Sequence, residues 1–167
     1  MHSLIYGQTE SGKTILTQKL ISSIKSQEPN KGVLVLDPLN SEGWLCDYLT
    51  TEPRSFLEVY WKSRLCHCVI DESVDSFDDF QKEMIKTATR GRHWGHSNYY
   101  LGQRPMVVPK TVRDQCTQLF LFRVSMDDAK NLSKEWGYED IANAHSLNQG
   151  EFYQVTRFGG CKKLKVF

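Results

Sequence analysis

Residues 7–14 read Gly7-Gln8-Thr9-Glu10-Ser11-Gly12-Lys13-Thr14 and match the pattern G-x-x-x-x-G-K-[ST] at every position. An apolar stretch typical of a β-strand, Ser3 to Tyr6, precedes them, and a helical pattern from Lys13 to Lys25 follows. Glycine lets the backbone curl so that its amide hydrogens point inward at phosphate oxygens, and the start of a helix adds partial positive charge. The motif therefore predicts a phosphate-binding loop, or P-loop, that holds a nucleoside triphosphate.

Two residues of this loop have individual roles in the prediction. We expect Lys13 to reach the β and γ phosphates, where its positive charge is needed. We expect the Thr14 hydroxyl to bind Mg2+, a cation that prefers hard oxygen ligands. The rest of the motif is expected to surround the phosphates with its backbone: Gly7, Gln8, Thr9, Glu10, Ser11 and Gly12.

Two acidic residues follow a second apolar run and predict the other half of the site. The run from Leu65 to Ile70 has the length of a buried strand and ends in Asp71 and Glu72. We expect Asp71 to hold the Mg2+, directly or through water. We expect Glu72 to orient or deprotonate an attacking water molecule, which favours hydrolysis over transfer to another acceptor.

Strand-like and helix-like stretches alternate along the chain, which predicts an α/β fold with a mainly parallel central sheet in three α/β/α layers. Further strands are expected at 32–36, 98–101 and 118–124. Further helices are expected at 42–49, at 55–64, from Ser76 onward and at 127–136, the last ending at Gly137. A C-terminal β-hairpin is expected from 151–157 and 162–167, turning at Gly159-Gly160. The length of 167 residues fits a single domain, 1–167.

The composition limits the classes of function. The chain carries 21 basic and 20 acidic residues, so a strongly basic field that would by itself indicate nucleic-acid binding is absent. No apolar run approaches the roughly 20 residues that a membrane helix needs, and residues 1–6 do not resemble a signal peptide. Five irregularly spaced cysteines favour a reducing compartment over a disulfide framework.

The triplet Cys66-His67-Cys68 leaves two interpretations open. Alternation along a strand would place the two thiols on one face and His67 on the other, which is typical of cysteines packed in a core. A zinc site is the alternative, but zinc normally takes four ligands and no second Cys/His pair lies nearby.

Beyond the P-loop, the order of features resembles a known superfamily. A helix ending in Arg90-Gly91-Arg92 is followed by a strand and then by Gln103-Arg104-Pro105. The stretch Val112-Arg113-Asp114-Gln115-Cys116 precedes the next strand, and Asp37-Pro38 closes the second one. From Leu4 to about Tyr153 the chain is similar to the FtsK/HerA superfamily of DNA-pumping ATPases, which have a P-loop NTPase fold of the RecA-like (ASCE) type.

This resemblance implies further roles. ATP with Mg2+ would be the bound nucleotide, since the P-loop motif itself does not read the base. Gln103 would be the polar sensor of the γ phosphate or the attacking water. Arg92 would be an arginine finger that enters the site of a neighbouring subunit, because a guanidinium stabilises the charge of phosphoryl transfer well. Arg90 is close enough in sequence to be the alternative finger.

The resemblance also implies partners. We expect a homo-oligomeric ring, pentamer or hexamer, that moves double-stranded DNA through a central pore, where several subunits together supply positive charge. Candidate pore contacts are Lys110, Arg113, Lys162, Lys163 and Lys165. By its size the chain is most similar to genome-packaging ATPases of icosahedral viruses with internal membranes. Capsid-vertex or membrane-associated viral proteins are then further partners, and the expected location is the host cytoplasm or the virion.

Two other classes of function remain open at this point. A P-loop nucleoside or nucleotide kinase fits the size and the motif, and the Arg90-Gly91-Arg92 region could form part of its lid. A non-enzymatic nucleotide switch, or an assembly ATPase of filamentous phage export, is the third hypothesis.

Overall fold

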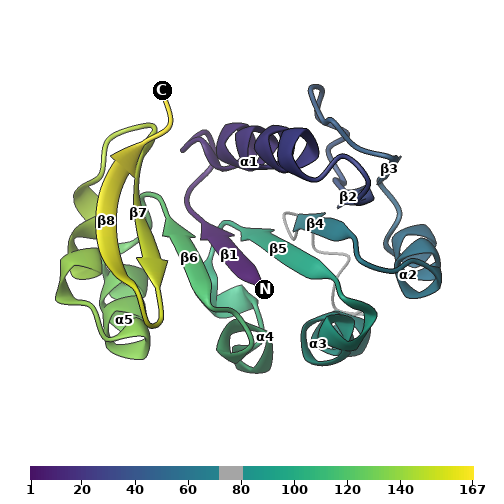
Figure 1. Cartoon of the computed structure of the whole chain (residues 1–167). Helices are drawn as coiled ribbons and strands as arrows, with labels where there is room; N and C mark the ends of the chain where they lie inside the picture. Colours follow the sequence, from purple (N-terminus) through teal and green to yellow (C-terminus); the bar gives the residue numbers. More distant parts are fainter. Residues whose placement is uncertain (72–80) are drawn as a thin grey trace.

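The computed structural model describes residues 1–71 and 81–167, and its strands form one twisted sheet (Figure 1). The eight strands in the described residues lie in the order β3-β2-β4-β5-β1-β6-β7-β8. Their bounds are β1 Ser3–Tyr6, β2 Val33–Leu36, β3 Tyr48–Thr50, β4 His67–Asp71, β5 Ser97–Gly102, β6 Gln118–Leu121, β7 Glu151–Thr156 and β8 Gly160–Lys165. The pairs from β3 across to β6 are parallel, and β7 and β8 are antiparallel additions at one edge.

Helices cover both faces of this sheet. The α-helices are α1 Lys13–Gln27, α2 Pro53–Lys62, α3 Gln81–Arg90, α4 Lys110–Asp114 and α5 Met126–Trp136. Short 3-10 turns are η2 Gly91–Trp94, η3 Pro105–Val107 and η4 Glu139–Ser146. Helix α1 lies alone on one face and the other α-helices lie on the opposite face (Figure 1). Each face of the sheet has its own apolar core. The predicted three-layer α/β architecture with its C-terminal hairpin is therefore confirmed.

The helix predicted for residues 42–49 is wrong. The chain there forms an irregular loop that leads into β3, because the buried Asp37 side chain organises the turn after β2. Its carboxylate accepts hydrogen bonds from the amides of Leu39 (3.0 Å) and Ser41 (2.9 Å) and from Trp44 Nε1 (2.9 Å). Burial opposes ionisation of Asp37, but these donors outweigh it and hold the carboxyl pKa below its ordinary value.

Two further predictions differ in detail. The strand predicted for 118–124 ends at Leu121. The helix expected from Ser76 is described only from Gln81, and its predicted start lies outside the described residues.

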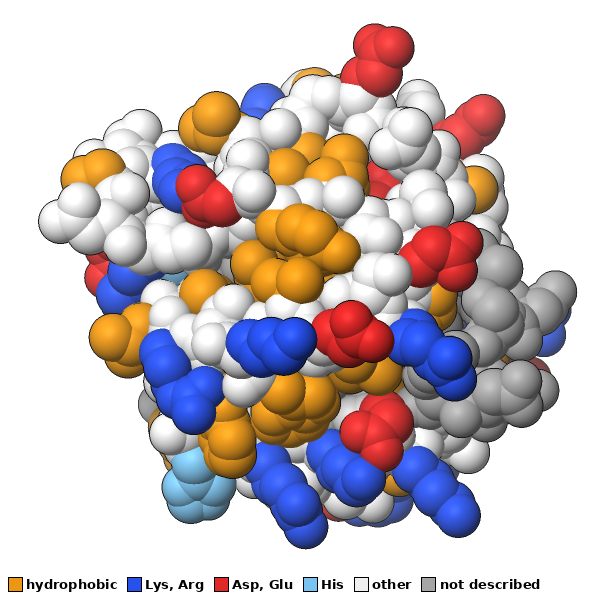
Figure 2. Space-filling model, turned by 90° about the vertical axis from the view of Figure 1, so that its right-hand side faces the viewer, with side chains coloured by type: hydrophobic (Ala, Val, Ile, Leu, Met, Phe, Trp, Pro, Cys, Tyr) orange, Lys and Arg blue, Asp and Glu red, His pale blue; other side chains and the backbone are white. Residues whose placement is uncertain are grey.

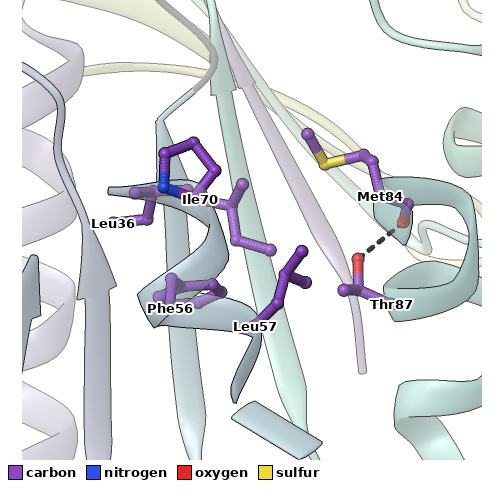
Figure 3. Close-up of a pocket in the computed structure, with 7 residues that line it drawn as sticks. Leu36, Phe56, Leu57, Ile70, Met84 and Thr87 are labelled. Carbon is purple, nitrogen blue, oxygen red and sulfur yellow. Dashed lines mark hydrogen bonds between the residues drawn. The ribbon is translucent and has the colours of Figure 1, made fainter. Parts of the chain in front are cut away.

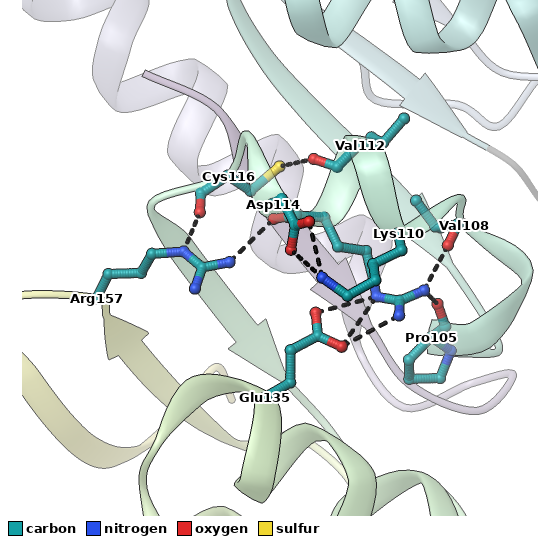
Figure 4. A network of polar contacts seen from close by, with 9 residues as sticks. Pro105, Val108, Lys110, Val112, Asp114, Cys116, Glu135 and Arg157 are labelled. Carbon is teal, nitrogen blue, oxygen red and sulfur yellow. Dashed lines mark hydrogen bonds and ion pairs between the residues drawn. The ribbon is translucent and has the colours of Figure 1, made fainter.

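A buried arginine of α4, Arg113, joins the segment after β5 to α5, and Figure 4 labels its partners Glu135, Pro105 and Val108. Arg113 donates to Glu135 from Nε (3.1 Å to Oε1) and from one terminal nitrogen (3.1 Å to Oε2). Its other terminal nitrogen donates to the carbonyl oxygens of Val108 (2.6 Å) and Pro105 (3.4 Å). Because Arg113 is buried and fully engaged in this way, the prediction that it contacts DNA in a pore is wrong.

A second arginine extends the network to the hairpin. Arg157, just after β7, donates to the carbonyl oxygens of Cys116 (2.8 Å) and Arg113 (3.2 Å). Its guanidinium also lies over the ring of Trp136, 4.3 Å from the centroid. These contacts fix the hairpin edge of the sheet against α4 and α5.

Replacing Arg113 by lysine is expected to reduce the free energy of unfolding by about 2 kcal/mol, because an ammonium group cannot serve Glu135 and two carbonyls at once. The measurement is urea denaturation followed by circular dichroism. The control is Arg104→Lys, since Arg104 is exposed and its replacement should change the value by less than about 0.5 kcal/mol. Equal losses in the two variants would contradict the structural role of Arg113.

Candidate functional site

The P-loop begins where β1 ends, near the middle of the sheet. The Gly7 amide donates to the carbonyl oxygen of Gly102 (3.2 Å), the last residue of β5. The Gln8 amide donates to the carbonyl oxygen of Arg123 (2.9 Å), just after β6. The loop therefore starts between the carboxyl ends of both neighbouring strands and is tied to each.

Both motif glycines are required by the geometry. A Cβ atom on Gly7 would come within 2.5 Å of Phe122 Cβ and 2.7 Å of Ser11 Oγ, so no side chain fits there. Gly12 has a φ of 113°, in the left-handed region that favours glycine. Glu10 also has a positive φ, 61°, which is uncommon for a residue with a side chain. The loop backbone is therefore curled in the way that the motif predicts.

Lys13 lies across the curled loop. Its Nζ donates to the carbonyl oxygens of Gly7 (2.7 Å) and Gln8 (2.8 Å). Burial lowers the pKa of Lys13, and the negative charge of Asp71 opposes that effect. Lys13 is also the first residue of α1, so the partial positive charge of the helix start falls on the same loop.

The loop contains polar groups that a phosphate would suit. The Ser11 hydroxyl is buried and has no hydrogen-bond partner among the described residues. Together with the ammonium group of Lys13 and the start of α1, this hydroxyl gives the loop hydrogen-bond donors and positive charge. The one acidic residue within the loop sequence is Glu10, which is exposed. This donor set fits a polyphosphate anion.

Asp71 is the last residue of β4 and lies at the carboxyl ends of the parallel strands, where the loop also begins. In the ladder it pairs with Leu101 of β5, which in turn pairs with Ile5 of β1. This register places Asp71 at the same end of the parallel strands as the loop, and its negative charge acts to raise the pKa of Lys13. Thr14 lies in the first turn of α1, so Thr14 and Asp71 are the residues that would hold Mg2+. Glu72 lies outside the described residues.

Gln103 lies next to the loop, whereas Arg92 does not. Gln103 is exposed and directly follows Gly102, whose carbonyl oxygen binds the Gly7 amide. Arg92 lies in η2, before β5 begins, and its charge acts on the amino terminus and on His2, the residue before β1. The six residues of β5 span about 20 Å between these two positions.

Arg92 and the phosphate loop therefore lie at opposite ends of the parallel strands. The alternative finger, Arg90, ends α3 and is at the same distant end. Neither arginine can contact a phosphate in the loop of its own chain, and the roles of Gln103, Arg92 and Glu72 stay predictions.

Contacts from the far end of the sequence support the loop, and sequence patterns did not predict them. Gln149 Nε2 donates to the carbonyl oxygen of Glu10 (3.0 Å), and the Gly150 amide donates to that of Ser11 (3.1 Å). Both donors lie in the turn that leads into β7. No local signal identifies them, because more than 130 residues separate them from the loop.

Two other features do not form part of this site. A small apolar hollow between α2, α3, β2 and β4 is lined by Leu36, Pro53, Phe56, Leu57, Ile70, Met84 and Thr87 (Figure 3). Its one hydroxyl, of Thr87, already donates to the carbonyl oxygen of Met84 (2.6 Å), so the hollow offers nothing to a phosphate. Cys66 and Cys68 belong to the apolar core, and His67 contacts Tyr99 and Glu28 on the other side, as the core interpretation predicts.

Comparison with known proteins identifies relatives by structure. No family model and no curated protein matches the sequence. The genome-packaging NTPase B204 of Sulfolobus turreted icosahedral virus 2, in complex with ATP-gammaS, matches with a TM-score of 0.72 and 15% identity over 98% of this chain and 96% of that chain. VirB4 of Thermoanaerobacter pseudethanolicus matches with a TM-score of 0.74 and 10% identity over 99% of this chain and 89% of that chain.

A third relative is much larger. The cytoplasmic domain of the type VII secretion ATPase EccC from Thermomonospora curvata matches with a TM-score of 0.74 and 14% identity over 98% of this chain, but over 25% of that chain. These three proteins are P-loop ATPases of the FtsK/HerA type. The chain shares the fold of these P-loop ATPases, which is the fold that the sequence resemblance predicts.

Proposed function

We propose that the chain is a motor ATPase that hydrolyses ATP in a homo-oligomeric ring and moves double-stranded DNA, in the manner of a genome-packaging ATPase. The observation that carries the proposal is the curled loop between β1 and α1, with Lys13 lying across it and Asp71 on a nearby strand. The similarity to B204, which extends over nearly the full length of both chains, supports the packaging class. B204 is described in complexes with ATP-gammaS, AMPPCP and AMP.

In this proposal Lys13 exchanges its partners when the nucleotide binds. Its Nζ leaves the carbonyl oxygens of Gly7 and Gln8 and donates to the β and γ phosphates, while the loop amides bind the remaining phosphate oxygens. Thr14 and Asp71 would hold the Mg2+, which neutralises negative charge on the phosphates. Gln103 would orient the attacking water and Glu72 would act as the base that accepts its proton.

The position of Arg92 is the reason for proposing a ring. Because Arg92 lies at the edge of the sheet remote from its own P-loop, it can serve as an arginine finger only in the site of a neighbouring subunit. A single subunit then lacks one of the groups that stabilise the charge of the transition state, and a pentamer or hexamer supplies it at each interface.

The DNA contacts would come from the hairpin. Lys162 and Lys165 on β8 are exposed and belong to the edge strand of the sheet. Lys110 and Lys163 are weaker candidates because they pair with Asp114 (2.8 Å) and Glu151 (3.2 Å). The opposite side of the molecule, near β3 and α2, shows Lys, Arg, Asp and Glu side chains around apolar ones, with several of the basic side chains in the lower part of the view (Figure 2).

The location follows from the same class of protein. None of the helices among the described residues is both long and apolar enough to cross a membrane. The host cytoplasm and the virion, with capsid-vertex or membrane-associated viral proteins as partners, are the places where a packaging ATPase would act.

Lys13→Ala is expected to weaken the binding of a non-hydrolysable ATP analogue with Mg2+ at least about tenfold and to abolish turnover, because a charge-assisted hydrogen bond to phosphate is lost. Isothermal titration calorimetry and a phosphate-release assay give the two values. The matched control is Lys130→Ala on the exposed side of α5, which should change neither. Unchanged affinity and turnover in Lys13→Ala would refute the proposed function, and transfer of phosphate to a nucleoside would favour a kinase.

Arg92→Ala is expected to keep nucleotide affinity and to lose turnover, because the missing group acts on the neighbouring subunit. A mixture of Arg92→Ala and Lys13→Ala subunits should regain part of the activity, since some interfaces then combine an intact loop with an intact finger. The measurement is ATPase activity across mixing ratios under assembled conditions. The same test with Arg90→Ala separates the two candidate arginines. No recovery at any ratio for either arginine, with assembly intact, would contradict action in the neighbouring subunit.

A further inference from the structure

Phe167 lies directly beside the phosphate loop. A Cβ atom on Gly12 would come within 3.4 Å of Phe167 Cε1, and one on Gly150 would come within 2.8 Å of Phe167 Cε2. Gly12 is the last residue before α1, and the C-terminal end of the chain reaches the start of α1 (Figure 1). One edge of the phenyl ring therefore touches the loop at the point where the helix begins.

The backbone around Phe167 is held in place relative to this loop. The Val166 amide donates to the carbonyl oxygen of Gly150 (2.9 Å), and the Gly150 amide donates to that of Ser11 (3.1 Å). Lys19 Nζ, on α1, donates to the carbonyl oxygen of Val166 (2.7 Å). These bonds link Val166 to the loop and to α1, so the position of the neighbouring ring is set by the same elements that position the phosphates.

The ring of Phe167 is only partly covered by the rest of the chain. Of the two phenylalanines that approach Gly12, Phe122 is fully buried, whereas Phe167 is 52% exposed. Gly12 lies near Cε1 of this ring and Gly150 near Cε2, Cδ2 and Cζ, and about half of the residue's surface remains open. An aromatic surface of this kind, at the rim of a phosphate loop, is suited to a flat apolar group that enters with the phosphates.

We propose that Phe167 is the platform on which the base of the bound nucleotide stacks. The proposal rests on the proposed function, because it needs a nucleoside triphosphate whose phosphates fill the loop. With the phosphates fixed, the ribose and base must leave the loop over an adjacent surface, and Phe167 presents an aromatic one at the start of α1. A phenyl ring has no donor or acceptor, so it binds the face of any base and does not read the base's edge.

The test compares ligands with and without a base. Dissociation constants are measured with Mg2+ for a non-hydrolysable ATP analogue and for inorganic tripolyphosphate, which has the phosphates alone. Phe167→Ala should weaken binding of the analogue about tenfold and leave binding of tripolyphosphate unchanged. Phe167→Trp, which keeps an aromatic face, should retain the affinity for the analogue.

A matched control is available on the same hairpin. Phe158, 96% exposed, lies in the turn at the other end of β7 and β8, so Phe158→Ala should change neither constant. Equal weakening of both ligands by Phe167→Ala would overturn the proposal, because the ring would then support only the loop. Unchanged affinity for the analogue would also overturn it. A different result would refute the proposed function: Lys13→Ala would bind both the analogue and tripolyphosphate with full affinity.

Discussion

The two hydrogen bonds that tie Gly7 to Gly102 and Gln8 to Arg123 are the constraint on which the site depends. They hold the start of the loop between the ends of β5 and β6, so the chain must turn back sharply before α1 can begin. That turn requires a residue without a side chain at position 7 and a residue with a left-handed backbone conformation at position 12. Its consequence is a curled loop beside the start of α1, with Lys13 lying across it, and the positive charge gathered there is complementary to a polyphosphate.

The order of the strands explains which residues can act together. The parallel arrangement of β4, β5, β1 and β6 brings Asp71, Gln103 and the loop to one edge of the sheet, although they are far apart in sequence. The same arrangement sends Arg92 to the opposite edge, since it comes before β5 and not after it. If Arg92 completes the site, as we propose, it must come from a second copy of the chain. The proposed ring therefore follows from strand direction and not from the charge of the chain, whose basic and acidic residues are nearly balanced.

Sequence patterns predicted the elements whose formation depends on local chemistry. The P-loop, the buried strands, the end of α5 at Gly137 and the C-terminal hairpin follow from glycines and apolar periodicity within a few residues. The hairpin turns at 157–159, one residue earlier than predicted, because Gly160 already belongs to β8. The sequence pattern does not predict the loop from 37 to 47. The buried carboxylate of Asp37 binds the amides of Leu39 and Ser41 and the indole of Trp44, and these bonds favour a loop over a helix. The buried role of Arg113 and the support of the P-loop by Gln149, Gly150 and Phe167 depend on partners distant in sequence, for which a single sequence has no signal.

The central claim is that the loop and Asp71 together hold a triphosphate with its metal. A crystal structure with a non-hydrolysable ATP analogue and Mg2+ tests it most directly. The account predicts that Lys13 Nζ has left the carbonyl oxygens of Gly7 and Gln8 for the β and γ phosphates, and that Thr14 and Asp71 lie around the metal, Asp71 directly or through water. An analogue bound elsewhere on the chain, with Lys13 still donating to those two carbonyls, would contradict it.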